Sequence, residues 1–229
     1  MLVYGKNVAK SVLEKSEIVN KIYLWDKFSD KNIISLIKRN NFSVKKCSKE
    51  ELNKIANENH QGIIMDINDY KFYTLEQILD DKSSDFIVIL DHLEDPHNFG
   101  AILRTCECAG VDYVIIQNKK SVSVTPTVMK TSSGALVYSK VCEVSNVNKT
   151  LDKLKENGYA IVGTDMKGTD YRKLKLPKKK VLIIGSEGSG LKYGSREKCD
   201  YIASIPMYGK VNSLNASVAA AIVIYELID

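Results

Sequence analysis

Amide, guanidinium and carboxylate side chains gather in three short segments, each of which begins near the end of an apolar run. The first segment, DPHNFGAILR, holds Asn98 and Arg104, and the second, GSEGSGL, holds Glu187 between two glycines. The third, IPMYGKVNSLNASVA, holds Ser213 and Asn215. The arginine could be an anion-binding group, and the three segments could together line one composite ligand pocket. These five residues are therefore candidate site residues.

Each of these residues also has a purely structural interpretation. Asn98 would suit a helix cap, Arg104 is either a surface charge or an anion-binding group, and Glu187 could simply accept backbone N–H bonds. His92 and His97 do not have metal-ligand spacing on any regular element, and the scattered cysteines have no partners at zinc spacing. We therefore expect no metal site.

The glycines of the second segment do not form a known phosphate-binding motif. Gly185, Gly188 and Gly190 are spaced G-x-x-G-x-G, whereas a dinucleotide fingerprint needs G-x-G-x-x-G directly after a strand. Leu191 stands where the lysine of a P-loop would be. The spacing therefore argues against a pyrophosphate or ATP as the ligand.

A nucleoside-like ligand held by backbone groups remains possible. Ile205, Met207 and Leu214 could supply apolar surfaces for a base. Gly185 would let the chain approach such a ligand closely, because glycine has no side chain.

The elements that must position these segments are short, continuous apolar runs that begin at Phe86. Continuous rather than alternating hydrophobicity indicates strands covered on both faces, which predicts a parallel sheet flanked by helices. Ligands of such sheets bind outside the carboxyl ends of the strands, so the three polar segments are expected to form one composite pocket. The runs are FIVIL, VDYVIIQ, YAIVGTD, VLIIGS and YIASIP.

The first part of the chain reads as a separate α/β unit of about 70 residues. Residues 66–85 have weak periodicity and acidic, Ser-containing ends, so the domain boundary is expected there. Helices are predicted at 7–13, 31–40 and 49–57, and strands at 18–26, 42–48 and 61–67.

Composition places the chain among ordinary globular proteins. Its 229 residues are 44% hydrophobic and carry a formal net charge of +5, which is compatible with a nucleic-acid partner but forms no basic arm. The five cysteines do not form a disulfide framework. Met1 is followed by a mixed polar segment rather than a signal peptide, and no apolar run could span a membrane. A cytoplasmic protein without a membrane partner is expected.

The three polar segments closely resemble the three motifs of the SpoU family of RNA 2′-O-ribose methyltransferases, within the SPOUT class. The similarity continues through KSVSVTPTVMKTSSGA, IVGTD and REKCDYIASIPM, and it covers roughly residues 86–229. The amino-terminal YGKNVAKSVLE also resembles the subgroup that methylates a guanosine of 23S ribosomal RNA.

This resemblance implies an α/β fold with two domains and a linker. Residues 1–75 would be an RNA substrate-binding domain similar to small ribosomal proteins, and residues 76–85 a linker. Residues 86–229 would be the catalytic domain, with a parallel sheet and a carboxyl-terminal deep trefoil knot. The implied cofactor is S-adenosylmethionine. The implied partners are RNA, with ribosomal RNA favoured over tRNA, and a second copy of the chain bound through the knotted domain; DNA is not expected.

The resemblance also implies roles for individual residues. Ser213 and Asn215 would lie near the reaction centre, and Arg104 would bind the adjacent phosphate and stabilise the alkoxide forming on the ribose 2′-oxygen. Glu187 and Asn98 would hold that arginine and the ribose in place. The helix after residue 217 would be core. The expected cofactor-binding residues are Gly163, Thr164, Gly185, Ile205, Met207 and Leu214.

The sequence is also compatible with two alternatives. The chain could be a catalytically silent RNA-binding or cofactor-binding relative, although the intact candidate residues argue against this. It could also be a tRNA 2′-O-ribose methyltransferase of the same family. A ribosomal-protein-like first domain favours ribosomal RNA.

Overall fold

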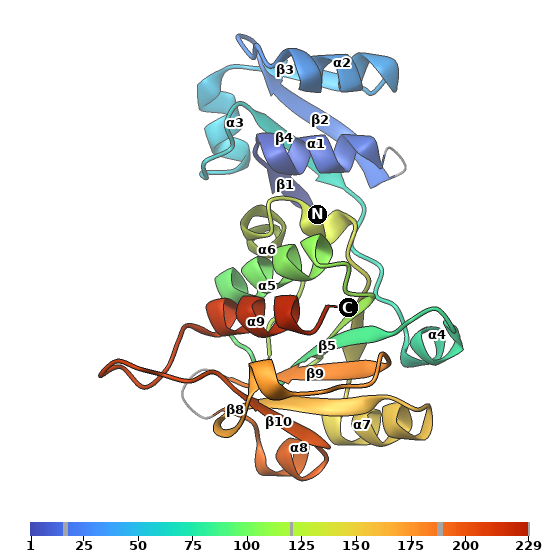
Figure 1. Ribbon diagram of the computed structural model, residues 1–229. Coiled ribbons are helices and arrows are strands. Elements are labelled where there is room, and N and C mark those ends of the chain that lie inside the picture. The colour runs from blue at the N-terminus through green and yellow to red at the C-terminus, as the bar shows by residue number, and fades with distance from the viewer. Residues whose placement is uncertain (16–17, 120, 187–189, 229) are drawn as a thin grey trace. The chain divides into compact units, whose positions relative to one another are not determined.

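The chain forms two compact units, each with its own sheet and its own core. The computed structural model describes residues 1–15, 18–119, 121–186 and 190–228. The first unit comprises Met1–Lys71 with Val124–Tyr138, and the second comprises Phe72–Ser123 with Ser139–Asp229 (Figure 1). A separate core in each unit meets the physical criterion for a domain.

The first unit is built on a four-stranded sheet with the order β1-β4-β2-β3 among its described residues. Strand β4 runs antiparallel to both β1 and β2, whereas β2 and β3 are parallel. Ile22 and Leu24 of β2 are buried, and the alternating Tyr23 and Trp25 pack with Leu52 of the covering helix. The strands are β1 (Leu2–Tyr4), β2 (Val19–Trp25), β3 (Val44–Cys47) and β4 (Ile63–Ile67).

Side-chain caps fix where helices of the first unit begin. Asp30 accepts the backbone N–H of Ile33 at 3.3 Å, and Ser48 forms a capping box with Glu51. The helices are α1 (Lys6–Glu14), α2 (Lys31–Arg39), α3 (Lys49–Ile55), α6 (Pro126–Thr131) and the 3-10 helix η2 (Ala135–Val137).

The second unit is built on a six-stranded sheet with the order β10-β8-β9-β5-β6-β7, and its described strands are all parallel. The two central strands, β5 and β9, are buried at every position. The expected parallel sheet is therefore confirmed. The strands are β5 (Phe86–Leu90), β6 (Tyr113–Gln117), β7 (Val141–Val144), β8 (Ala160–Asp170), β9 (Lys180–Ile184) and β10 (Tyr201–Ser204).

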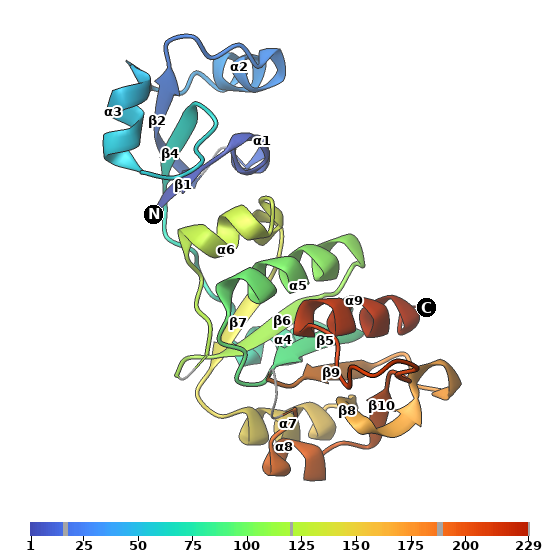
Figure 2. The same cartoon turned by 90° about the vertical axis from the view of Figure 1, so that its left-hand side faces the viewer.

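Helices cover both faces of this second sheet. Helices α5 and α9 pack together on one face, and α7 and α8 lie on the other (Figure 2). This arrangement explains the continuous hydrophobicity of the central strands, because neither face meets water. The helices are α4 (Leu75–Asp80), α5 (Pro96–Cys108), α7 (Val147–Glu156), α8 (Tyr193–Glu197), α9 (Ala216–Glu226) and the 3-10 helix η3 (Tyr171–Lys173). In the described part of the chain, no helix is long and apolar enough to cross a membrane.

The compact units differ from the expected domain ranges in two places. Residues 124–138 fall in the expected catalytic domain but pack in the first unit, where α6 contacts β1 and Lys130 Nζ donates to the carbonyl of Asn59 at 3.1 Å. The expected linker, 76–85, contains most of α4, which belongs to the second unit. A capping box between Thr74 and Gln77 starts this short helix, and the side chain of Ile78 anchors it in the core.

Candidate cofactor cavity and reaction site

A cavity of about 620 Å³ lies at the carboxyl ends of β8, β9 and β10 in the second unit. Its position agrees with the rule for parallel sheets, in which ligands bind beyond the carboxyl ends of strands. Its size suits a small organic ligand. The described lining residues are Thr164, Asp165, Met166, Ile184, Gly185, Ser186, Gly190, Ala203, Ile205, Met207, Asn212, Ser213, Leu214, Asn215, Ala216, Ala219 and Val223.

One wall of the cavity is made by an irregular part of β8. Ile202 of β10 pairs with Gly163 of β8, but the next residue, Ala203, pairs with Thr169. The residues between those two partners on β8, 164–168, therefore leave the regular ladder and form a bulge. The bulge brings Thr164, Asp165 and Met166 to the cavity.

A second wall is formed by tight backbone packing at Gly185. A Cβ atom at this position would lie 2.4 Å from the carbonyl carbon of Gly190 and 2.7 Å from the nitrogen of Leu191. Both neighbouring atoms belong to the backbone, which cannot turn away as a flexible side chain can. Any side chain at position 185 would therefore displace the loop that borders the cavity.

The start of α9 brings two candidate catalytic residues together. Asn215 caps the helix, because its Oδ1 accepts the backbone N–H of Ser217 at 2.9 Å and of Val218 at 3.3 Å. Its Nδ2 donates to Oδ1 of Asn98 on α5 at 3.0 Å, and Asn98 is only 5% exposed. This hydrogen bond joins the first and third polar segments at the edge of the cavity.

The other predicted site residues divide into three groups. Gly163 of β8 is not among the described lining residues, and a Cβ atom there would collide with the side chains of Leu191 and Cys199. Arg104 is exposed on α5 and is not among the described lining residues, and Glu187 lies outside the described residues. The third group lines the cavity and comprises Thr164, Gly185, Ile205, Met207, Ser213, Leu214 and Asn215.

Helical geometry explains why Asn98 and Arg104 lie apart. They are six residues apart on α5, and a rotation of about 100° per residue puts them on different faces. Asn98 faces the start of α9, whereas Arg104 faces outward.

Two kinds of lining residue were not predicted from the sequence. Asp165 follows the matched Gly-Thr pair directly, but nothing in its type or spacing marked it. Ala216, Ala219 and Val223 recur at helical spacing and turn one side of α9 toward the cavity. The expectation that this helix is core holds for Ala220, Val223 and Ile224, which are buried, but not for Val218, which is 48% exposed.

Asp165 is held by contacts on both of its oxygens. Oδ1 accepts the backbone N–H of Lys167 at 2.9 Å, and Oδ2 forms an ion pair with Nη1 of Arg196 on α8. Nη2 of the same arginine donates to the carbonyl of Lys167 at 3.2 Å. Ser204 Oγ donates to the carbonyl of Met166 at 2.9 Å, so side chains of α8 and β10 both hold the bulge in place.

A buried polar cluster anchors α8 beside the site. Asp91 directly follows β5 and is 1% exposed; it accepts a hydrogen bond from Oγ of Ser195 at 2.8 Å. The other carboxylate oxygen of Asp91, Oδ1, lies 2.6 Å from Nδ1 of His92. These contacts satisfy a buried carboxylate. Among the described residues, no three metal-binding side chains gather in one place.

Comparison with known proteins identifies the class to which this architecture belongs. The profile of the SpoU rRNA Methylase family matches residues 85–225, and a profile described as RNA 2′-O ribose methyltransferase substrate binding matches residues 2–73. The chain belongs to the SpoU rRNA methylase family, a family of RNA methyltransferases. The family expected from the three motifs is thereby confirmed.

Individual relatives agree with this assignment. A Staphylococcus haemolyticus protein assigned to the TrmH family of tRNA/rRNA methyltransferases is 38% identical, over 99% of this chain and 94% of its own length. The SpoU methyltransferase AviRb from Streptomyces viridochromogenes, crystallised with the cofactor AdoMet, has the same fold, with a TM-score of 0.85 at 23% identity over 100% of this chain and 89% of that one.

A third relative covers less of the chain. The A. aeolicus TrmH/SpoU tRNA modifying enzyme is 32% identical, but it matches only 67% of this chain and 78% of its own, with a TM-score of 0.57.

Proposed function

We propose that this chain is an S-adenosylmethionine-dependent RNA 2′-O-ribose methyltransferase that acts on a guanosine of 23S ribosomal RNA. The observation that carries the proposal is the cavity at the carboxyl ends of the second sheet. The second and third motif regions line it, and the hydrogen bond from Asn215 to Asn98 connects the first motif region to its edge. That convergence is what a site for a cofactor and a ribose requires.

The cavity fits the adenosyl group of the proposed cofactor. Its volume of about 620 Å³ is in the range of small-molecule sites, and the side chains of Ile184, Ile205 and Leu214 offer apolar surfaces for a base. Gly185 keeps backbone atoms close to the ligand space. Bound S-adenosylmethionine would supply a methyl group already activated by the sulfonium.

The difficulty left to the protein is the nucleophile, because a ribose 2′-hydroxyl attacks poorly until it loses its proton. A guanidinium stays protonated, so Arg104 cannot act as the base. Its role is to bind the neighbouring phosphate and to stabilise the alkoxide. Asn98, Ser213 and Asn215 orient the ribose, and Glu187 supports the arginine.

The choice of ribosomal RNA rests on the first unit. Residues 2–73 match a substrate-binding profile of 2′-O ribose methyltransferases. The A. aeolicus relative, described as a tRNA modifying enzyme, matches only 67% of this chain. A dedicated RNA-binding domain suits a large, structured RNA. Because ribosomal RNA is the proposed substrate, the proposed location of the protein is the cytoplasm.

We further propose that the chain acts as a homodimer and that its carboxyl-terminal part forms the trefoil knot typical of this family. Helix α9 has apolar residues on every side, and such helices are normally buried all round. Yet Val218 is 48% exposed and Tyr225 is 55% exposed. A second copy of the chain would cover this surface, and light scattering of the purified protein tests it.

The function is tested by methyl transfer from labelled S-adenosylmethionine to purified 23S ribosomal RNA and to total tRNA, followed by mapping of alkali-resistant ribose positions. The proposal predicts one labelled guanosine in 23S RNA. Label confined to tRNA would contradict the substrate, and no transfer to either RNA or to ribosomal subunits would contradict the enzymatic function. A matched deletion strain should lack the same ribose methylation.

A further inference from the structure

Asp165 is the one residue with a charged side chain among the described residues that line the cavity. Much of the remaining lining is apolar or small. S-adenosylmethionine carries two positive groups, a sulfonium and an ammonium, both in its methionyl half. A carboxylate in the wall is complementary to that half, whereas the apolar wall suits the adenine.

The carboxylate borders open space in the cavity. A Cβ atom built on Gly190 would have Oδ2 of Asp165 as its single described neighbour, at 4.0 Å. Both residues line the cavity. The oxygen therefore lies at the surface of the cavity, within reach of a bound ligand.

Arg196 fixes the direction of this carboxylate. It pairs with Oδ2 through one nitrogen and donates to the carbonyl of Lys167 through the other, at 3.2 Å. The side chain of Asp165 is 23% exposed, so the pair is partly shielded from water. A carboxylate that accepts one bond on each oxygen still has lone pairs for a further donor.

We propose that Asp165 binds the cationic methionyl half of S-adenosylmethionine and that Arg196 is its positioning residue. The inference rests on the proposed function, because it takes S-adenosylmethionine to be the ligand. Arg196 is not among the described lining residues and acts through Asp165. Because Arg196 already orients the carboxylate, binding of the ligand does not have to include the entropy cost of ordering that side chain.

The test is calorimetric titration of the full-length protein with three ligands. S-adenosylmethionine carries both cations, S-adenosylhomocysteine keeps only the ammonium, and 5′-methylthioadenosine has neither. Asp165→Asn should weaken binding of S-adenosylmethionine about ten- to a hundredfold, the range for a hydrogen bond to a charged group. Binding of 5′-methylthioadenosine should stay within about twofold of wild type. An equal loss for S-adenosylhomocysteine assigns the contact to the ammonium, and a loss confined to S-adenosylmethionine assigns it to the sulfonium.

A matched control removes a carboxylate outside the cavity. Asp152 pairs with Lys198, and Asp152→Asn should leave all three affinities unchanged. Arg196→Lys keeps a positive charge but cannot fork onto two oxygens, so it should weaken S-adenosylmethionine about three- to tenfold. The affinity of Arg196→Lys for 5′-methylthioadenosine should again be preserved. If the variant disrupted the cavity wall in general, that affinity would fall as well.

Two results would overturn the inference. One is an unchanged affinity of Asp165→Asn for S-adenosylmethionine, and the other is an equal loss of affinity for 5′-methylthioadenosine. If Asp165→Asn does not fold, as judged by its melting curve, the Arg196→Lys titrations decide on the same criterion. Failure of the wild-type protein to bind S-adenosylmethionine would instead contradict the proposed function.

Discussion

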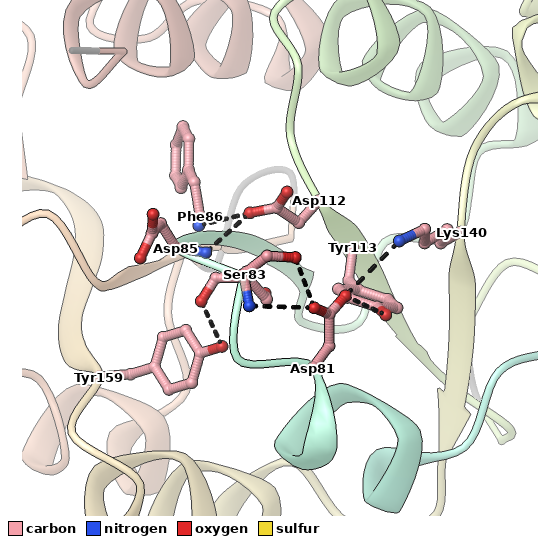
Figure 3. Close-up of polar contacts among 9 residues, drawn as sticks. Asp81, Ser83, Asp85, Phe86, Asp112, Tyr113, Lys140 and Tyr159 are labelled. Carbon is pink, nitrogen blue, oxygen red and sulfur yellow. Dashed lines mark hydrogen bonds and ion pairs between the residues drawn. The ribbon is translucent and has the colours of Figure 1, made fainter.

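The two ends of the parallel sheet in the second unit both carry polar side chains, but they use them differently. At the amino ends of β5 and β6, polar groups pair with one another. Asp112 Oδ2 accepts the backbone N–H groups of Asp85 at 2.8 Å and Phe86 at 2.9 Å (Figure 3). The hydroxyl of Tyr159 donates to the carbonyl of Ser84 at 2.9 Å.

Asp81 is the centre of this amino-end network. It accepts hydrogen bonds from Oγ of Ser83 at 2.6 Å and from the hydroxyl of Tyr113 at 2.9 Å, and Lys140 Nζ lies 3.6 Å away (Figure 3). These bonds tie the chain after α4 to the sheet. The acceptors are satisfied within the protein, so the network has a structural role.

The carboxyl ends of the strands show the opposite arrangement. Small residues and amides surround a cavity of about 620 Å³, and the hydrogen bond between Asn98 and Asn215 stands at its edge. Polar residue type alone therefore does not separate a site from a structural network. What separates them is whether the groups close on one another or face space that a ligand can fill.

The largest expected effect is at the carboxyl end, at Gly185. Gly185→Ala puts a methyl group 2.4 Å from a backbone carbon of Gly190, so the backbone of Gly190, which lines the cavity, must shift. S-adenosylmethionine affinity should fall by more than about a hundredfold, because several contacts are lost together. Calorimetry measures this. Gly209→Ala is the control, since its Cβ meets nothing within 4 Å and binding should persist. Normal affinity in Gly185→Ala would remove this glycine from the pocket.

The next effect concerns Arg104, which stands apart from the cavity on the exposed face of α5. Arg104→Lys and Arg104→Ala should keep cofactor affinity but lower methyl transfer about a hundred- to a thousandfold, as expected when a donor to developing charge is lost. Single-turnover transfer at saturating RNA measures chemistry apart from binding. Glu107→Gln, at another exposed position of the same helix, should react normally.

Two outcomes would change the role of Arg104. A lysine variant with a near wild-type rate would contradict bidentate binding. An alanine variant with normal chemistry but weaker RNA affinity would reduce Arg104 to a phosphate contact. The activation of the hydroxyl would then fall to Glu187 or to water.

A smaller effect is expected where the two asparagines meet. Asn215→Ser keeps a hydroxyl oxygen to cap α9 but is too short to reach Asn98, so it removes the link and keeps the cap. Methyl transfer should fall about tenfold with little change in melting temperature, in line with one lost hydrogen bond. Asn215→Ala loses the cap as well and should cost about 1 kcal/mol of stability. If the serine variant reacts at the wild-type rate, the link is only structural.

The same contrast explains what the sequence could predict. Strands β5 and β9 were predictable because continuous apolar runs need cover on both faces. β1 and β7 were not predicted, because three or four residues carry too little pattern. The second and third motif segments located the cavity, since carboxyl ends of parallel strands meet at one edge, and the first reaches its edge only through Asn98.

Other features of the site depend on long-range packing. The bulge at 164–168 arises from how β10 pairs with β8, and no local signal marks it. The bond between Asn98 and Asn215 spans 117 positions of the chain, so only the fold brings the two amides together. Asp165 enters the cavity for the same reason.

The smallest effect is expected at the amino-end network, and it tests whether that end is only structural. Hydrogen bonds from Ser83 and Tyr113 lower the pKa of Asp81 from 3.8 to about 2. A carboxylate whose pKa is lowered by folding stabilises the native state above its unfolded pKa of about 4, and this contribution disappears as the pH falls from about 4 to about 2. Asp81→Asn should therefore lower the melting temperature by about 1–3 °C at neutral pH, and the difference from wild type should vanish near pH 2. Thermal melts across this pH range measure it, with Asp152→Asn as an exposed control. Because Asp81 closes on partners within the protein, its variant should bind S-adenosylmethionine as tightly as wild type at neutral pH. A weakened affinity would mean that the two ends of the sheet are coupled, and the contrast between a structural end and a functional end would fail.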